Sequence, residues 1–111
     1  MFSAETLQKF AREVAKYPAD QKQSASMACL AHAQEEKGWL APESIEAVAN
    51  YLGMPPIAAY EVASFYNMYD LKPVGKYKIT VCTNLPCALS GGYHAGEYLQ
   101  HKLGIGYGET T

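Results

Sequence analysis

The sequence predicts a mostly helical chain of the α+β class, in which four helices are followed by one strand, a loop and a further helix. Apolar residues recur at helical spacing over roughly the first 70 positions. After a turn signal, the segment 77–82 alternates and is rich in β-branched and aromatic residues, which is typical of a strand. We therefore expect a helical bundle segment over residues 1–72 and a second, incomplete domain over 73–111.

The first two helices are predicted from their caps and stops. The first is expected to begin after Ser3, a residue type that caps helix N-termini, and to end before Pro18. Its apolar residues define one face: Leu7, Phe10, Ala11 and Val14. The second is expected to run from near Asp20 to a stop at Gly38. Its buried face is expected to comprise Met27, Leu30 and Ala31.

The third and fourth helices each begin at a proline, which is tolerated in the first turn of a helix. The third is expected to start at Pro42 and to end at Gly53. Its apolar residues repeat at helical spacing: Ile45, Val48, Ala49 and Leu52. The fourth follows Pro55-Pro56, with an apolar side expected to comprise Ala58, Val62, Phe65 and Tyr69. We expect Trp39 and Leu40, between the second and third helices, to fill the core.

The pattern changes at the turn signal 72–75, Lys-Pro-Val-Gly. We expect a strand over Tyr77–Cys82, a loop over 83–86, and a helix after Gly91-Gly92. The apolar residues expected to be buried on that helix are Ala95, Tyr98, Leu99 and Leu103. A single strand cannot form a sheet, and even a hairpin is marginal alone. The remaining strands of this domain are therefore expected outside these 111 residues.

Charge and hydropathy exclude several classes of function. Lys and Arg total 9 against 11 Asp and Glu, giving a net charge of −2 and no basic stripe for nucleic-acid phosphates. No apolar run approaches the ~20 residues of a membrane span, so no direct membrane insertion is expected. The N-terminus also lacks the features of a secretory signal. A reducing compartment is expected, where cysteines more often bind metal, catalyse or lie buried than form disulfides.

The strongest sign of a functional site is a C-x4-C pair, Cys82 and Cys87, at the end of the expected strand. Such a loop can wrap a metal centre and donate N–H groups to it. A plant-type ferredoxin would need a third cysteine at position 90, which is Ser90. A zinc site would need a second ligand pair, for which only His94 and His101 lie downstream. Two buried thiols without metal are the remaining alternative.

Four segments taken together make the sequence recognisable. They are Glu61–Tyr69 (EVASFYNMY), Lys72–Tyr77 (KPVGKY), Val81–Cys87 (VCTNLPC) and Gly91-Gly92. In this order they closely resemble the small 2Fe–2S subunit of NADH:quinone oxidoreductase, known as the E subunit of bacterial respiratory complex I. The likeness runs from about Gln21 to the end of the chain, and the combined run is far more specific than the cysteine pair alone.

The resemblance implies a helical N-terminal segment followed by a thioredoxin-like 2Fe–2S ferredoxin domain. In this family the cluster is held by four cysteines, a C-x4-C pair and a later C-x3-C pair. The first pair corresponds to Cys82 and Cys87, and the second is implied to lie beyond Thr111. Cys29 has no place in this pattern and is expected to be a buried free thiol. Tyr60 and its neighbouring aromatic residues are expected to pack against the next domain.

The implied function is one-electron transfer within a larger complex. The family docks on the flavin- and NADH-binding subunit, so FMN and NADH are expected on that partner. The assembly lies on the cytoplasmic side of the bacterial inner membrane. Related subunits occur in NAD-reducing hydrogenases and NAD-dependent formate dehydrogenases. A helical interaction module without a cluster is the alternative from another class, whereas a thiol–disulfide enzyme would need C-x2-C.

Overall fold

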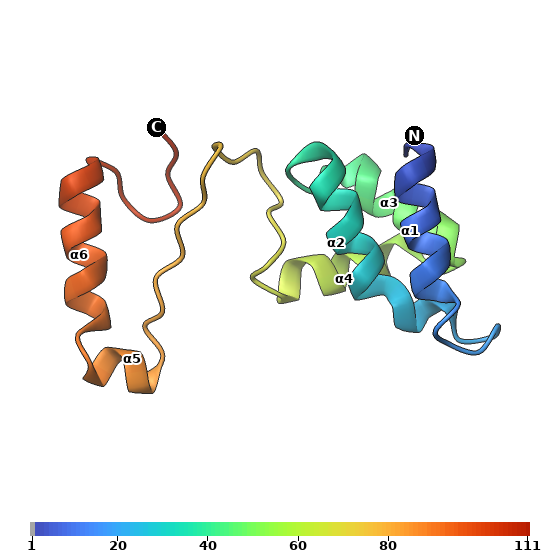
Figure 1. Cartoon of the computed structure of the whole chain (residues 1–111), viewed down its shortest axis with the longest axis horizontal. Coiled ribbons are helices and arrows are strands. Elements are labelled where there is room, and N and C mark those ends of the chain that lie inside the picture. Colours follow the sequence, from blue (N-terminus) through green and yellow to red (C-terminus); the bar gives the residue numbers. More distant parts are fainter. Residues whose placement is uncertain (1) are drawn as a thin grey trace. The chain divides into compact units, whose positions relative to one another are not determined.

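The computed structural model describes residues 2–111, and the chain divides into two compact units, Met1–Pro73 and Val74–Thr111. The first unit contains four α-helices and a short 3-10 helix: α1 (Ala4–Val14), η1 (Lys22–Ala25), α2 (Ser26–Lys37), α3 (Pro42–Leu52) and α4 (Pro56–Phe65) (Figure 1). The second contains α5 (Leu85–Leu89) and α6 (Gly92–Leu103).

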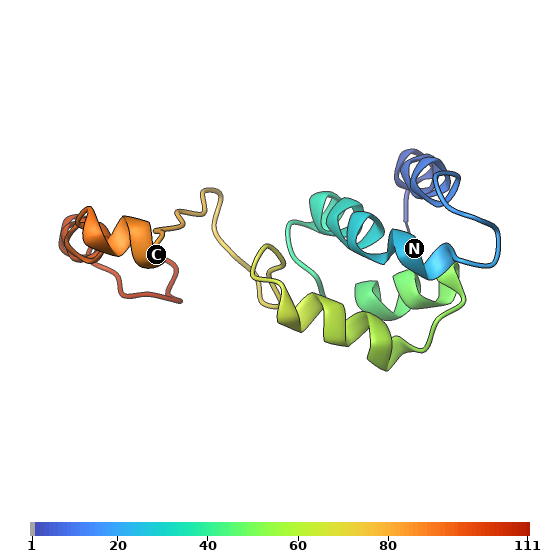
Figure 2. The same cartoon turned by 90° about the horizontal axis from the view of Figure 1, so that it is seen from below.

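The other three α-helices of the first unit are arranged around α2. This helix packs against α1, α3 and α4, and α3 also packs along α4, as the second view shows (Figure 2). Three predicted helix ends are confirmed, but α2 begins at Ser26 and not near Asp20, because residues 22–25 form the 3-10 helix η1. Ser3 caps α1 by accepting a hydrogen bond from the Thr6 backbone N–H at 3.2 Å. Gly38 and Gly53 end α2 and α3 with φ values of 90° and 70°, which glycine adopts without a Cβ penalty.

The core of the first unit is formed mostly by aliphatic side chains from all four helices, together with two aromatic rings. The predicted face of α3 is confirmed, since Ile45, Val48, Ala49 and Leu52 are all buried. Leu40 is fully buried, as expected, whereas Trp39 beside it is only partly buried. The other buried apolar residues of this core are Phe10, Ala25, Cys29, Leu30, Ala33, Met54, Ala59, Ala63 and Tyr69.

The predicted faces of α1 and α2 are only partly right. Leu7, Ala11 and Met27 were expected inside but lie exposed, whereas Phe10 and Leu30 are fully buried. The buried stripe of α2 comprises Ser26, Cys29, Leu30 and Ala33. Small side chains dominate this stripe because three helices pack closely against α2. In a helix rich in alanine, hydropathy does not show which side is buried, so the face could not be predicted.

The buried side of α4 also differs from the prediction. Phe65 was expected in the core, but it is 79% exposed at the last position of the helix. The buried residues are Ala59 and Ala63, with Ala58 and Val62 partly buried beside them. The reason is the same, because small residues let α4 approach α2 and α3 while the large ones project outward.

The segment after α4 is tied back onto α2 by polar contacts. Tyr69 was expected on the fourth helix, but it follows the helix and is nevertheless buried. Its hydroxyl donates to the Met27 carbonyl at 2.7 Å. The Gln34 amide donates to the Met68 carbonyl at 3.0 Å and accepts from the Asp70 N–H at 2.7 Å. These contacts fix the chain where it leaves the first unit.

The strand predicted over Tyr77–Cys82 is wrong for the described residues, which form no β-strand. The local pattern favours extended backbone, but a ladder needs a second strand, and none of the residues described here supplies one. The loop predicted over 83–86 is also partly wrong, because α5 begins at Leu85. The helix expected after Gly91-Gly92 is confirmed as α6.

The second unit has little core of its own. On α6, Leu99 is half-buried, whereas Ala95, Tyr98 and Leu103 are exposed against expectation. Gly96 is the only buried residue of α6, where Tyr107 and Val81 approach it. Outward-facing apolar side chains on this unit include Tyr77, Ile79, Leu85, Leu89 and Tyr93. The predicted burial needs a second layer, which residues 74–111 do not provide.

Hydrogen exchange on this 111-residue chain should therefore differ strongly between the two units. We expect fast exchange at the amides of 77–82, which lie outside any helix or strand, and much slower exchange in α3 and α4. Mass spectrometry of peptides after brief exchange measures the contrast. Protection of 77–82 that equals that of α3 at every protein concentration would contradict this expectation. Protection that grows with concentration would indicate pairing between chains.

Candidate metal centre

The two site cysteines lie at the entrance to α5. Cys82 belongs to the extended segment before the helix, and Cys87 is the third residue of α5. Asn84 is the N-cap, with β-region angles of φ −67° and ψ 168°. Pro86 lies in the first turn, where its missing N–H removes no helical hydrogen bond. The C-x4-C segment thus turns the chain from extended to helical between its two thiols.

The structure brings these two thiols together. Both are free; Cys82 is exposed and Cys87 is half-buried. The Asn84 backbone N–H donates to the Cys82 sulfur and, together with a hydrogen bond from the Cys87 side chain, lowers the pKa of Cys82. The same bond to Cys82 raises the pKa of Cys87, because its proton is held between the two sulfurs. Two sulfur atoms that lie within hydrogen-bond reach of each other can bind one soft metal centre together.

The first residue of α6 touches both cysteine backbones. Gly91 precedes it in the left-handed region, with φ 97°. A Cβ built on Gly92 would lie 2.6 Å from the Cys82 carbonyl oxygen and 2.9 Å from that of Cys87. In the sequence this Gly-Gly pair stands out only as part of a recognisable run. The close approach is visible only in three dimensions.

The two neighbouring thiols are half of the ligands that a four-thiolate metal site needs. Among residues 2–111, no group of three or more His, Cys, Asp or Glu side chains gathers in a way that could hold a metal ion. His94 and His101 are exposed on α6 and do not complete a zinc site with the cysteines. The chemistry of two adjacent thiols suits an iron–sulfur cluster whose other two ligands come from elsewhere.

Cys29 lies apart from this chemistry, in the core of the first unit. It is fully buried on α2, in the same buried stripe as Leu30 and Ala33. Burial, with a smaller effect from the Glu13 carboxylate, raises its pKa to about 11. The prediction of a buried free thiol is confirmed.

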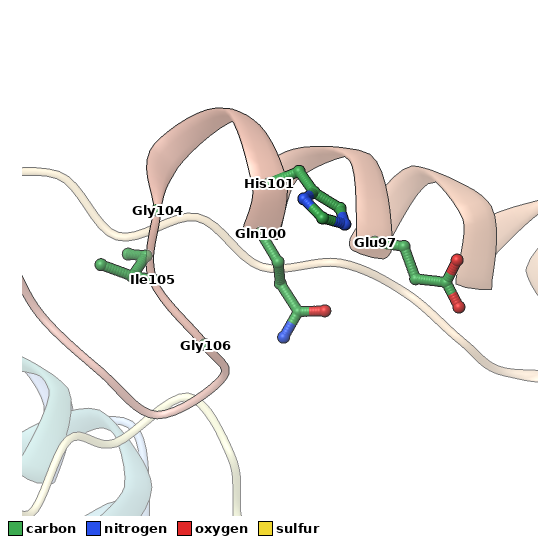
Figure 3. Close-up of a pocket in the computed structure, with 6 residues that line it drawn as sticks. All are labelled: Glu97, Gln100, His101, Gly104, Ile105 and Gly106. Carbon is green, nitrogen blue, oxygen red and sulfur yellow. The ribbon is translucent and has the colours of Figure 1, made fainter.

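A shallow hollow of about 390 Å³ lies on the second unit, away from the cysteines (Figure 3). Figure 3 shows three polar side chains on the last turns of α6, Glu97, Gln100 and His101, beside the loop that follows the helix. The loop residues Gly104, Ile105 and Gly106 complete the lining. Gly106 donates its N–H to the Glu109 carboxylate at 2.7 Å, which holds this loop in a tight turn. The hollow shares no residue with the thiol pair.

A comparison with known protein families identifies the family of the chain that carries the thiol pair. Residues 10–111 match the thioredoxin-like [2Fe-2S] ferredoxin family. The chain belongs to this family. The match covers both compact units, so the helical segment and the cysteine-bearing unit are parts of one ferredoxin family pattern. The mostly helical structure and the thioredoxin-like family agree with the predicted fold class at this level.

Curated members of the family give a more specific likeness. The chain is 44% identical over 97 residues to NADH-quinone oxidoreductase subunit 2 of Thermus thermophilus. This alignment covers 87% of the chain and 54% of that protein. It is 48% and 50% identical over 99 residues to the E subunits of NADH-quinone oxidoreductase from Rickettsia prowazekii and Rickettsia conorii. These alignments cover 88% of the chain and 56% and 59% of the relatives. The resemblance drawn from the motifs is thereby confirmed.

The ferredoxin chain thus spans a little more than half the length of the curated relatives that it matches. None of the helices described in residues 2–111 is long and apolar enough to cross a membrane.

Proposed function

We propose that this chain is part of the E subunit of NADH:quinone oxidoreductase, which transfers electrons, and that Cys82 and Cys87 hold one side of its 2Fe–2S cluster. The observation that carries the proposal is the adjacency of the two thiols at the start of α5, in a chain of the thioredoxin-like [2Fe-2S] ferredoxin family. The names of the relatives support the choice of complex.

The missing ligands are proposed to come from outside these 111 residues. Support comes from the greater length of the relatives and from the exposed apolar side chains of the second unit. Residues 73–111 would then be the opening part of a thioredoxin-like domain, whose later strands would pair with the segment 77–82. Residues 1–72 would be the helical bundle segment that precedes it.

The chemistry supplied by the bound cluster is one-electron transfer, and the chain's own residues hold and tune it. Cys82 and Cys87 would ligate iron as thiolates. The Asn84 N–H, which already donates to the Cys82 sulfur, would stabilise negative charge there. Hydrogen bonds of this kind to ligand sulfurs are one of the means by which a protein sets the potential of a cluster.

The partner that fits this role is the flavin- and NADH-binding subunit of the same complex, which would hold FMN and NADH. The assembly is proposed to lie on the cytoplasmic side of the bacterial inner membrane. The support is that the relatives are named as subunits of NADH-quinone oxidoreductase. On α4, the exposed aromatic side chains of Tyr60 and Phe65 form apolar surface that a partner protein could contact.

The test compares the full-length gene product with the 111-residue chain. We expect the reading frame to continue into a C-x3-C pair and its product to show the absorption and electron paramagnetic resonance spectra of a 2Fe–2S cluster. The 111-residue chain, after reconstitution with iron and sulfide, should hold no stable cluster as a monomer, because its described residues supply only one thiol pair. A stop after Thr111, or a cluster in the monomer, would overturn the proposed ligand set.

A further inference from the structure

Three segments of the second unit converge at one glycine. Cys82 ends the extended segment, Cys87 lies in α5, and Gly92 is the first residue of α6. A Cβ at Gly92 would lie 2.6 Å from the Cys82 carbonyl oxygen, 2.9 Å from the Cys87 carbonyl oxygen and 3.1 Å from the Cys87 carbonyl carbon. Real Cβ atoms essentially never lie closer than 3.0 Å to such atoms, so any side chain at this position must displace backbone.

The turn before Gly92 leaves the backbone little freedom to absorb such a displacement. The Ser90 N–H donates to the carbonyls of Pro86 and Cys87, at 3.2 and 3.1 Å. The Gly91 N–H donates to the Ala88 carbonyl at 3.3 Å, and Gly91 itself takes a left-handed φ of 97°. The start of α6 is therefore held against α5, and Gly92 lies close to both cysteine carbonyls.

We propose that Gly92 is the positioning residue of the thiol pair: because it lacks a side chain, the Cys82 and Cys87 backbones approach the start of α6 and their sulfurs converge. Each carbonyl belongs to the same residue as a thiol, so pushing a carbonyl away also moves the sulfur. This inference deepens the proposed function and rests on it wherever it concerns the cluster. The spacing of the thiols themselves can be tested without any metal.

The test uses phenylarsine oxide, which closes a ring over two neighbouring thiols, on the 111-residue chain carrying Cys29→Ala. Only Cys82 and Cys87 then remain to react. We expect Gly92→Ala to weaken capture about tenfold or more, the range seen when residues that orient metal ligands are changed. The rate of single-thiol alkylation by iodoacetamide and the helicity by circular dichroism should stay close to those of the parent.

The matched control is Gly75→Ala, another glycine-to-alanine change in the second unit. The nearest atom to its Cβ is a methyl group of Thr110 at 3.3 Å, which can give way, and capture should be unchanged. If Gly92→Ala also lowers helicity, Gly91→Ala separates the causes. Its Cβ meets nothing within 4 Å, although its positive φ strains the turn. Equal loss of capture in Gly91→Ala and Gly92→Ala would overturn the proposal, as would full capture by Gly92→Ala.

The two proposals fail in different ways. A full-length protein that takes up no iron and sulfide would refute the proposed function, while the capture comparison would still test the role of Gly92. Conversely, a normal cluster in the full-length protein, together with full arsenical capture by Gly92→Ala in the 111-residue chain carrying Cys29→Ala, would refute the positioning role alone.

Discussion

Replacing Cys82 or Cys87 with alanine is expected to abolish the 2Fe–2S cluster of the full-length protein. Each change would remove one of the four proposed thiolate ligands, and alanine offers no atom that can bind iron. The single thiol that remains cannot replace the pair that we propose to ligate the iron. Iron and sulfide content, together with the electron paramagnetic resonance spectrum, should fall to background in both variants.

The matched control for this experiment is Cys29→Ala. This thiol is fully buried in the core of the first unit, so its removal should leave the cluster signal intact. The lost sulfur leaves a small cavity and a modest loss of stability, of about 1 kcal/mol. A folded Cys29→Ala protein without cluster would show that the ligands are assigned wrongly. A normal cluster in either Cys82→Ala or Cys87→Ala would show the same.

The second large effect is expected from Phe10→Ala, which should come close to unfolding the first unit. Phe10 is fully buried on α1, with ring centroids 5.0 Å from Phe2 and 5.2 Å from Tyr51. Truncating a buried phenylalanine costs about 3–5 kcal/mol. A unit of this size has a total unfolding free energy of only about 4–11 kcal/mol. Urea unfolding followed by the fluorescence of Trp39, the single tryptophan, measures the change in the first unit.

Leu7→Ala is the matched control for that measurement. It removes a large apolar side chain from the same helix, but Leu7 lies exposed. We expect a change within about 0.5 kcal/mol, as is usual for surface positions. Equal losses in the two variants would mean that α1 buries the face predicted from its sequence rather than the face that the structure shows.

The sequence predicts the helices of the first unit well because residues that end helices are easy to recognise, and because α3 carries its large apolar residues on one face. Ser3, Gly38 and Gly53 act locally, through a capping oxygen or a left-handed φ, and need no tertiary contact to be recognised. The buried face of α3 is equally clear, since its large apolar residues fall on one stripe. On α2 and α4 the buried residues are mostly small, and alanine does not distinguish a surface from a close helix contact.

The second unit is harder to predict because its structure depends on distant residues. The segment 77–82 has the composition of a strand, but a strand exists only when it is paired. Likewise, Tyr98 and Leu103 are spaced for burial, yet nothing in residues 74–111 covers them. At the site, residue types alone indicate Cys82 and Cys87. The role of Gly92 could not be predicted, because it depends on how closely two carbonyl groups approach in space.

The burial of Cys29 has a consequence for thiol exchange. Disulfides form and reshuffle through attack by a thiolate, and a thiol with a pKa of about 11 inside a closed core supplies almost none at neutral pH. The folded chain therefore contains no third nucleophile that could scramble the pair at α5. Any mixed disulfide at Cys82 or Cys87 must involve a thiol from another molecule or from residues outside this segment. A Cys29 adduct, by contrast, would record that the helical unit had opened.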